Sequence, residues 1–422
     1  MYEKYQLKNK ANVYLVPQKD AQSVTVLVMY PVGSRYEPEK LAGVSHYIEH
    51  MMFKGTKSRK NTLILTREID RLGAHYNAFT GKEYTGYYIK TDKKYSEISI
   101  DILSDMLFNS KFDPKEMERE KGPIVEEIRM YKDNPMMNID NLFEDLIFAG
   151  CPLGRDIAGT EKHVMSYKRP EVLQFRDKYY DSSNMYIVVA GAVSEDTKKY
   201  LDKYFGAEKS KHPTCGRDKK FKPFCFGPEA KKDRIFVSKK ETDQAQMMLG
   251  FQAFKYGDKR NVAASVMNNI LGGSMSSRLF IQIRERRGLA YFVRSGAEQF
   301  RDAGYSYVRA GLEVKNINKA IAVMKKEMEK IMQKGASKRE LADAKSNIRG
   351  GLTLSMEDSS TQANWYVGQA LYIDKIKTPE QKLAEIDRVT NEDVMNVAKQ
   401  IFKMNKMRVA IIGDVEAKDV EF

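Results

Sequence analysis

The feature that most constrains the fold of this 422-residue chain is an internal repeat. The stretch TVLVMYPVGSRYEPEKLAGVSHYIEHMMFKGT in the first half is echoed by QMMLGFQAFKYGDKRNVAASVMNNILGGS in the second. The two halves also close alike, because NMYIVVAGAV ends a strand at Gly191 and NKMRVAIIGDV ends one at Gly413. A duplicated domain agrees with the length, since a chain of this size is too long for one ordinary core.

The repeat sets the predicted domain limits. Residues 1–206 form the first domain and residues 234–422 the second. Between them, residues 207–233 are rich in Lys, Gly and Pro and lack hydrophobic periodicity, which is typical of a linker.

Local patterns predict both strands and helices. NVYLVPQ, SVTVLVMYPVG and EYTGYYIKT are rich in β-branched and aromatic residues and bounded by turn residues, as strands are. AGVSHYIEHMMF, LILTREIDRLG and YSEISIDILSDMLF have apolar residues at helical spacing. We therefore expect an α+β class in which a mixed or antiparallel sheet packs with helices in layers.

Composition narrows the environment more than the function. The formal net charge of +14 comes from scattered lysines and arginines, so it indicates a solvated basic surface rather than a nucleic-acid site. Three cysteines, Cys151, Cys215 and Cys225, form no CxxC motif and favour a reducing compartment.

The first residues lack the apolar core of a signal peptide, and no apolar run is long enough to span a bilayer. We expect a soluble, cytoplasmic protein with no nucleic-acid or membrane partner.

The stretch HYIEH contains candidate metal ligands and a carboxylate beside them. His46 and His50 are four residues apart, so on a helix they share one face, and Glu49 flanks that face. This is H-x-x-E-H, the inverted zincin motif, in which two imidazoles hold zinc and the carboxylate stands near its open position. Two helical histidines can also be ordinary helix residues. The metal site is favoured because the chain has only five histidines and because a third ligand is available.

A catalytic zinc ion needs a third protein ligand and a position left for water. EMEREKGPIVEEIRMYKD offers Glu120 and Glu127, which are seven residues apart and return to nearly the same helical face. Glu126 points away from that face. Acidic helix faces are often only solvated surface, so the residues by themselves leave this ligand open.

Together these motifs resemble the M16 family of metallopeptidases, called pitrilysin-like or inverzincin. The likeness is to the two-domain bacterial processing-peptidase type, similar to the mitochondrial processing peptidase β subunit. It runs along nearly the whole chain. It rests on four stretches: HYIEH, a glutamate that follows it after 76 intervening residues, GAHYNAFTGKEYTGYY, and LGGSMSSRLFIQIRERRGLAYFVRSG. The resemblance implies two homologous domains of the M16/LuxS-like metallohydrolase type that form a clam-like chamber.

The resemblance also implies the site. His46, His50 and Glu127 would bind one Zn2+ per chain, and Glu49 would be the general base. Glu120 matches a second glutamate that orients a ligand or supports catalysis. Gly122 and Pro123 follow it, and because proline disrupts a helix we expect a kink there or a helix that begins at Pro123.

Substrate-binding residues follow in the same way. Arg284 and Tyr291 match the family's paired Arg and Tyr, which would clamp a substrate carbonyl and donate to the oxyanion. Asn77 and Ala78 match an edge strand that pairs with the peptide backbone. His75 is predicted to be a turn residue, because the ligand set is complete without it.

The second half lacks the metal set, since Ala263, Val266 and Met267 stand where His46, Glu49 and His50 stand in the first. We expect it to be an inactive repeat that completes the substrate site. The predicted function is zinc-dependent cleavage of peptides or unfolded segments inside the chamber, by a homodimer. The alternatives are a non-catalytic M16-like partner or scaffold subunit, and a basic anion-binding scaffold with an incidental metal motif.

Overall fold

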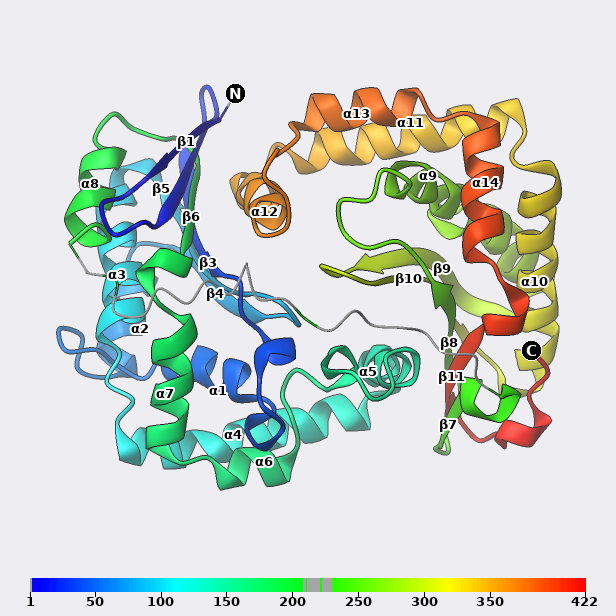
Figure 1. Cartoon of the computed structure of the whole chain (residues 1–422), viewed down its shortest axis with the longest axis horizontal. Coiled ribbons are helices and arrows are strands. Elements are labelled where there is room, and N and C mark those ends of the chain that lie inside the picture. Colours follow the sequence, from blue (N-terminus) through cyan, green and yellow to red (C-terminus); the bar gives the residue numbers. More distant parts are fainter. Residues whose placement is uncertain (1, 208–209, 211–220, 222–229) are drawn as a thin grey trace. The chain divides into compact units, whose positions relative to one another are not determined.

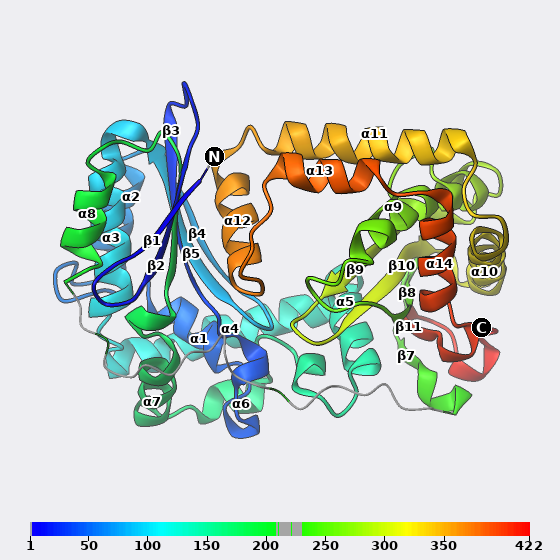
Figure 2. The same ribbon diagram turned by 45° about the horizontal axis from the view of Figure 1, so that its top comes forward.

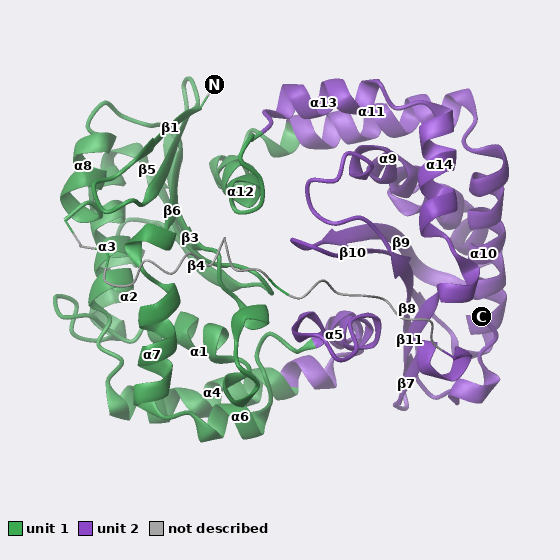
Figure 3. Cartoon of the chain, in the orientation of Figure 1, with its two compact units in different colours: residues 1–129, 155–221, 354–376 green, residues 130–154, 222–353, 377–422 purple. Residues whose placement is uncertain are grey.

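The computed structural model describes residues 2–207, 210, 221 and 230–422 and divides into two compact units (Figures 1 and 3). Unit 1 comprises residues 1–129, 155–221 and 354–376, and unit 2 comprises residues 130–154, 222–353 and 377–422. Each half of the chain therefore gives one segment to the other half's unit, an exchange that the predicted contiguous domains did not include. The predicted linker, residues 207–233, lies largely outside the described residues, as do Cys215 and Cys225.

Unit 1 is built on a six-stranded mixed sheet in the order β1-β2-β6-β3-β5-β4. Only β2 and β6 are parallel, and β4 is an edge strand. Their bounds are β1 (Glu3–Gln6), β2 (Asn12–Pro17), β3 (Ser23–Tyr30), β4 (His75–Thr80), β5 (Thr85–Asp92) and β6 (Tyr186–Gly191).

Helices cover both faces of this sheet, as Figure 2 shows. Alternation along β3 sends Val24, Val26 and Val28 into the larger core, while Leu27 and Met29 pack with α12 on the opposite face. The helices of unit 1 are α1 (Val44–Met51), α2 (Thr62–Asp70), α3 (Ser96–Asn109), α4 (Pro114–Asp133), α6 (Glu161–Ser166), α7 (Arg169–Tyr179), α8 (Thr197–Tyr204) and α12 (Ser359–Ala370).

Helix α4 runs from Pro114 to Asp133 with Pro123 inside it, so the expected start at Pro123 is wrong, while the kink stays a prediction. A proline inside a helix costs about 3 kcal/mol or more, because it removes a hydrogen bond and crowds the preceding turn. Burial of the inner face of α4, including Met117, Ile124 and Ile128, offsets this cost. One helix therefore carries both Glu120 and Glu127, and its residues from Met130 on belong to unit 2.

Unit 2 repeats the plan with a five-stranded sheet in the order β7-β11-β8-β10-β9. Its β7 and β11 are parallel, as β2 and β6 are in unit 1. The bounds are β7 (Ile235–Lys239), β8 (Ala245–Gln252), β9 (Ala290–Gln299), β10 (Gly304–Leu312), β11 (Arg408–Gly413), α5 (Pro135–Ile147), α9 (Asn261–Gly272), α10 (Ile317–Lys334), α11 (Lys338–Ser355), α13 (Pro379–Asp387) and α14 (Asn391–Ile401).

The exchanged helix α5 packs on one face of the unit 2 sheet. Its Ile139, Phe143 and Ile147 are almost fully buried against Met248 of β8 and Ile412 of β11. The structure thus confirms the predicted α+β class, with two homologous layered domains and mixed sheets. Among the described residues, no helix combines the length and the apolarity needed to cross a membrane.

Candidate metal centre

Helix α1, which carries the H-x-x-E-H motif, begins at a position that requires glycine. Gly43 has a φ of 93°, and a Cβ there would lie 2.3 Å from the carbonyl oxygen of Ala158. The carboxylate of Glu37 caps the start of this helix. It accepts hydrogen bonds from the backbone nitrogens of Gly43 at 2.6 Å and Ser45 at 2.7 Å. The loop before α1 therefore fixes where this helix starts.

Glu37 is itself buried, at 5% exposure. Burial raises the pKa of Glu37 to about 7, although the bonds from Ser45 and Gly43 and the nearby Arg155 work in the opposite direction. Sequence reasoning missed this residue because it lies outside the motif and is not a metal ligand.

Three donor atoms from α1 and α4 form a small triangle. Nε2 of His46 and Nε2 of His50 are 3.3 Å apart, and Oε2 of Glu127 lies 3.6 Å from the first and 3.4 Å from the second. Among the described residues these three side chains make the group of His, Cys, Asp and Glu that could hold a metal ion. The structure thus brings together the three residues that the resemblance named as ligands, across a long interval of sequence.

The triangle has the dimensions of a zinc site. Ligand atoms about 2.0–2.1 Å from a tetrahedral Zn2+ lie about 3.3–3.4 Å from one another. Two imidazole nitrogens and one carboxylate oxygen are also a donor set that catalytic zinc sites use, with the fourth position left for water. The residues present therefore fit the ion that the resemblance implies.

The electrostatics of the triangle favour a cation. Burial lowers the pKa of His50, but the carboxylates of Glu120 and Glu127 outweigh it and raise that pKa to about 9. Hydrogen bonds from His46 and His50 hold the pKa of Glu127 well below its usual range. With no metal bound, a proton on His50 can supply the positive charge, so a metal ion and that proton compete for one place.

Glu120 stands behind His50 rather than in the triangle. Its Oε1 lies 2.9 Å from Nδ1 of His50, and its Oε2 lies 2.5 Å from Nζ of Lys54. Burial works against ionisation of Glu120, but these two partners prevail and lower its pKa. A carboxylate at Nδ1 fixes the imidazole tautomer and turns Nε2 toward the metal position, as in other metal-binding histidines.

Glu49 lies three residues after His46 and directly before His50, and it is half-buried. Burial raises the pKa of Glu49, while a hydrogen bond from Thr80 and the two imidazoles pull it down. The net upward shift brings this carboxylate closer to the pKa that a general base needs near neutral pH. Glu126, by contrast, is exposed and pairs with Arg129 at 2.7 Å, pointing away as predicted.

Asn77 and Ala78 lie in edge strand β4, whose other side is open in the sheet order. Oδ1 of Asn77 accepts a hydrogen bond from the backbone nitrogen of Ala78 at 2.9 Å. His75 begins β4, so its prediction as a turn residue is wrong, and it stands apart from the triangle group.

Arg284 and Tyr291 lie together in unit 2. The Arg284 guanidinium is 5.6 Å from the centre of the Tyr291 ring and 4.9 Å from that of Phe280. Tyr291 is 70% exposed, which is unusual for an aromatic side chain. Arg284 sits in a π-helical turn, η7 (Phe280–Glu285), a geometry that is frequent at functional sites.

In the second repeat, helix α9 corresponds to α1 but lacks the metal-ligating residues and the glutamate. Ala263, Val266 and Met267 of α9 are buried in the apolar core of unit 2. Apolar residues that pack in the core replace the metal-ligating residues, so this helix stabilises the fold of unit 2.

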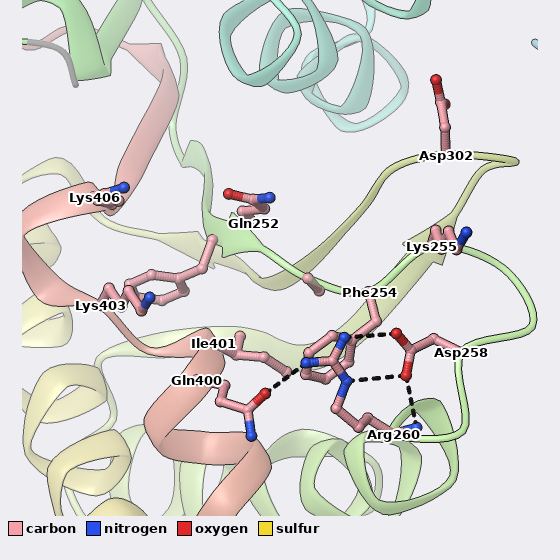
Figure 4. A pocket seen from close by; sticks show the side chains of 12 residues that line it. Gln252, Phe254, Lys255, Asp258, Arg260, Asp302, Gln400, Ile401, Lys403 and Lys406 are labelled. Atoms are coloured by element: carbon pink, nitrogen blue, oxygen red, sulfur yellow. Dashed lines mark hydrogen bonds and ion pairs between the residues drawn. The ribbon is translucent and has the colours of Figure 1, made fainter. Parts of the chain in front are cut away.

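Unit 2 also has a surface hollow of about 380 Å3 (Figure 4). Arg260 closes one side, bonded to Asp258 at 2.6 Å and to Gln400 at 2.7 Å, and it lies 4.0 Å from the centre of the Phe254 ring. The remaining walls carry Lys255, Lys403 and Lys406. None of its lining residues was predicted as a site residue.

Comparison with known proteins identifies the family. Residues 13–161 match the family model described as Insulinase (Peptidase family M16), and residues 166–348 match the one described as Peptidase M16 inactive domain. The "Uncharacterized zinc protease YmxG" of Bacillus subtilis is 34% identical over 95% of this chain and 96% of its own. The chain belongs to peptidase family M16. The narrower likeness to the mitochondrial processing peptidase β subunit stays a prediction.

Other M16 relatives agree. The "Uncharacterized zinc protease SCO5738" of Streptomyces coelicolor is 32% identical over 94% of this chain and 86% of its own. The crystal structure of a protease from Helicobacter pylori shares the M16 fold with a TM-score of 0.88, at 23% identity over 98% of this chain and 99% of that one. The solved M16 inactive domain from Pseudomonas fluorescens has a TM-score of 0.89, at 19% identity over 99% of each chain.

Proposed function

We propose that this chain is a zinc-dependent endopeptidase that cleaves peptides or unfolded segments. The observation that carries the proposal is the triangle of His46, His50 and Glu127, with Glu49 beside it. The names of the relatives support a peptidase and support zinc as its metal.

The roles follow from the chemistry of each group. Zinc held by His46, His50 and Glu127 would supply a Lewis acid and lower the pKa of water toward neutrality. Glu49 would accept a proton from the attacking water and donate it to the leaving amine. Burial raises the pKa of Glu49, which favours a carboxylate that both accepts and releases a proton.

Substrate binding is the finer part of the proposal. The open edge of β4 suits an extended peptide, which would add to the sheet at Asn77 and Ala78. Arg284 would hold a substrate carbonyl and Tyr291 would donate to the developing oxyanion, as the resemblance implies. The enclosed chamber, the homodimer and the cytoplasmic location are carried over from the sequence alone.

The rival function is a non-catalytic partner or scaffold subunit of the same family. The description "inactive domain" applies to the second half, where Ala263, Val266 and Met267 replace the metal set. The first half retains the ligands, the base and the His50 partner Glu120. We therefore assign hydrolysis to unit 1.

Metal analysis combined with digestion of a mixed peptide library tests the proposal. The purified protein should contain about one zinc ion per chain, and a chelator should stop cleavage that added zinc restores. A protein that binds zinc but cuts no peptide would support the non-catalytic partner. A protein without metal affinity would support the scaffold with an incidental motif.

Replacing Glu120 with glutamine should weaken zinc binding by about 10- to 100-fold, the usual effect of losing a partner behind a metal-binding histidine. Glutamine keeps the shape but removes the charge that holds Nδ1 of His50. Competition with a chromogenic chelator measures the dissociation constant. Glu118→Gln, an exposed neighbour on α4 that pairs with Lys121, is the control. An unchanged affinity in Glu120→Gln would remove Glu120 from the site.

A further inference from the structure

Thr80 connects the edge strand β4 with the carboxylate of Glu49. Its hydroxyl donates a short hydrogen bond to Oε2 of Glu49. Alternation along β4 puts Thr80 on the same face as Ala78, which packs into the core beside α1. The last residue of the strand therefore contacts the proposed base directly.

The turn that follows Thr80 is held firmly in place. Arg35 and Glu83 form an ion pair of 2.6 Å with side chains that are 1% and 0% exposed. The backbone nitrogens of Ser34 and Arg35 donate to the carbonyl oxygens of Gly81 and Lys82. Because a buried ion pair and two backbone bonds anchor this turn, the hydroxyl of Thr80 occupies a fixed point.

A fixed donor matters because a glutamate side chain has several rotamers. A catalytic group must be kept within about 0.5 Å of its productive position, and a shift of about 1 Å can reduce the rate 100-fold. The other interactions described for the Glu49 side chain are electrostatic effects between it and His46, His50, Glu127, Tyr87 and Tyr180, and such effects do not fix an orientation.

We infer that Thr80 is a positioning residue that sets the Glu49 carboxylate against a peptide added to β4. This inference rests on the proposed function. The strand that would pair with the substrate backbone and the donor that orients the base are parts of one element. The distance between the base and the scissile bond is thereby tied to the substrate-binding edge itself.

Replacing Thr80 with valine tests the inference, because valine keeps the branched shape and loses only the donor. We expect Thr80→Val to lower kcat by about 10- to 100-fold with KM changed less than about threefold, since base geometry and not binding is lost. Zinc content and Tm should stay at the wild-type values. Thr80→Ser, which restores the hydroxyl, should recover most of kcat.

The control is Thr66→Val. Thr66 is also half-buried, and its hydroxyl bonds only to backbone carbonyls of α2, at 2.9 Å for Thr62. This variant should keep the wild-type kcat. If it lost as much activity as Thr80→Val, the loss would reflect a missing hydroxyl in general and the inference would be wrong.

A double variant separates positioning from a structural role. If Thr80 acts through Glu49, then Glu49→Gln/Thr80→Val should be no slower than Glu49→Gln alone. A further loss in the double variant, a loss of zinc in Thr80→Val, or a wild-type kcat in Thr80→Val would each overturn the inference while the proposed function stood. If the wild type cut no peptide in the library, the proposed function and the inference would both fall.

Discussion

Glu49→Gln should reduce peptide cleavage by about 10^3-fold, within the range that general acid–base catalysis contributes, while the protein keeps its zinc. Glutamine has the size of glutamate and can still accept the hydrogen bond from Thr80. It cannot take a proton from water. His46, His50 and Glu127 are unchanged, so the donor triangle remains complete.

The measurement is kcat/KM on a peptide that the wild type cleaves, alongside zinc content determined on the same preparation. Glu39→Gln, at an exposed position before α1, is the control for the change of charge and should behave as wild type. Cleavage by Glu49→Gln at the wild-type rate would show that another group is the base. Loss of zinc in this variant would make Glu49 a metal ligand instead.

Glu127→Ala should weaken zinc binding by well over 100-fold, because losing even an indirect partner of a ligand costs about 10- to 100-fold. The substitution removes one of three donor atoms, the oxygen that lies 3.4 Å from Nε2 of His50. It also removes a carboxylate that raises the pKa of His50, so the imidazole loses a negative neighbour. Activity should disappear together with the metal.

Glu126→Ala is the matched control, since it removes a carboxylate from the adjacent position on the same helix. Glu126 is exposed and bonded to Arg129, so its loss should leave zinc binding unchanged. Equilibrium dialysis against buffered zinc gives both dissociation constants. If Glu127→Ala bound one zinc ion per chain as tightly as the wild type, the third ligand would have to be another residue.

Local sequence was sufficient for the elements that carry the donor atoms. The motif HYIEH has helical spacing, and the structure has α1 from Val44 to Met51. The seven-residue interval between Glu120 and Glu127 predicted a shared face, and both contact His50 because α4 is a single helix. Periodicity decides such questions because each one concerns only one element.

The sequence could not predict the tertiary contacts that hold the site together. Glu37, in the loop before α1, accepts hydrogen bonds from the start of that helix, and Thr80, at the end of β4, donates one to Glu49. Nothing in the sequence around these two residues distinguishes them from other polar residues. Pro123 is tolerated because the inner face of α4 is buried, a balance that local propensity does not reveal. The exchange of α5 and α12 between the units likewise leaves no trace in local periodicity.

That exchange has a consequence for how the protein is made on the ribosome. One face of the unit 1 sheet, with Leu27 and Met29, is covered by Ala363, Tyr366 and Val367 of α12. Those residues are synthesised more than 150 positions after β6 completes the sheet. This apolar face of the first half therefore stays exposed until synthesis of the chain is nearly complete. During that time such a surface can bind chaperones or aggregate.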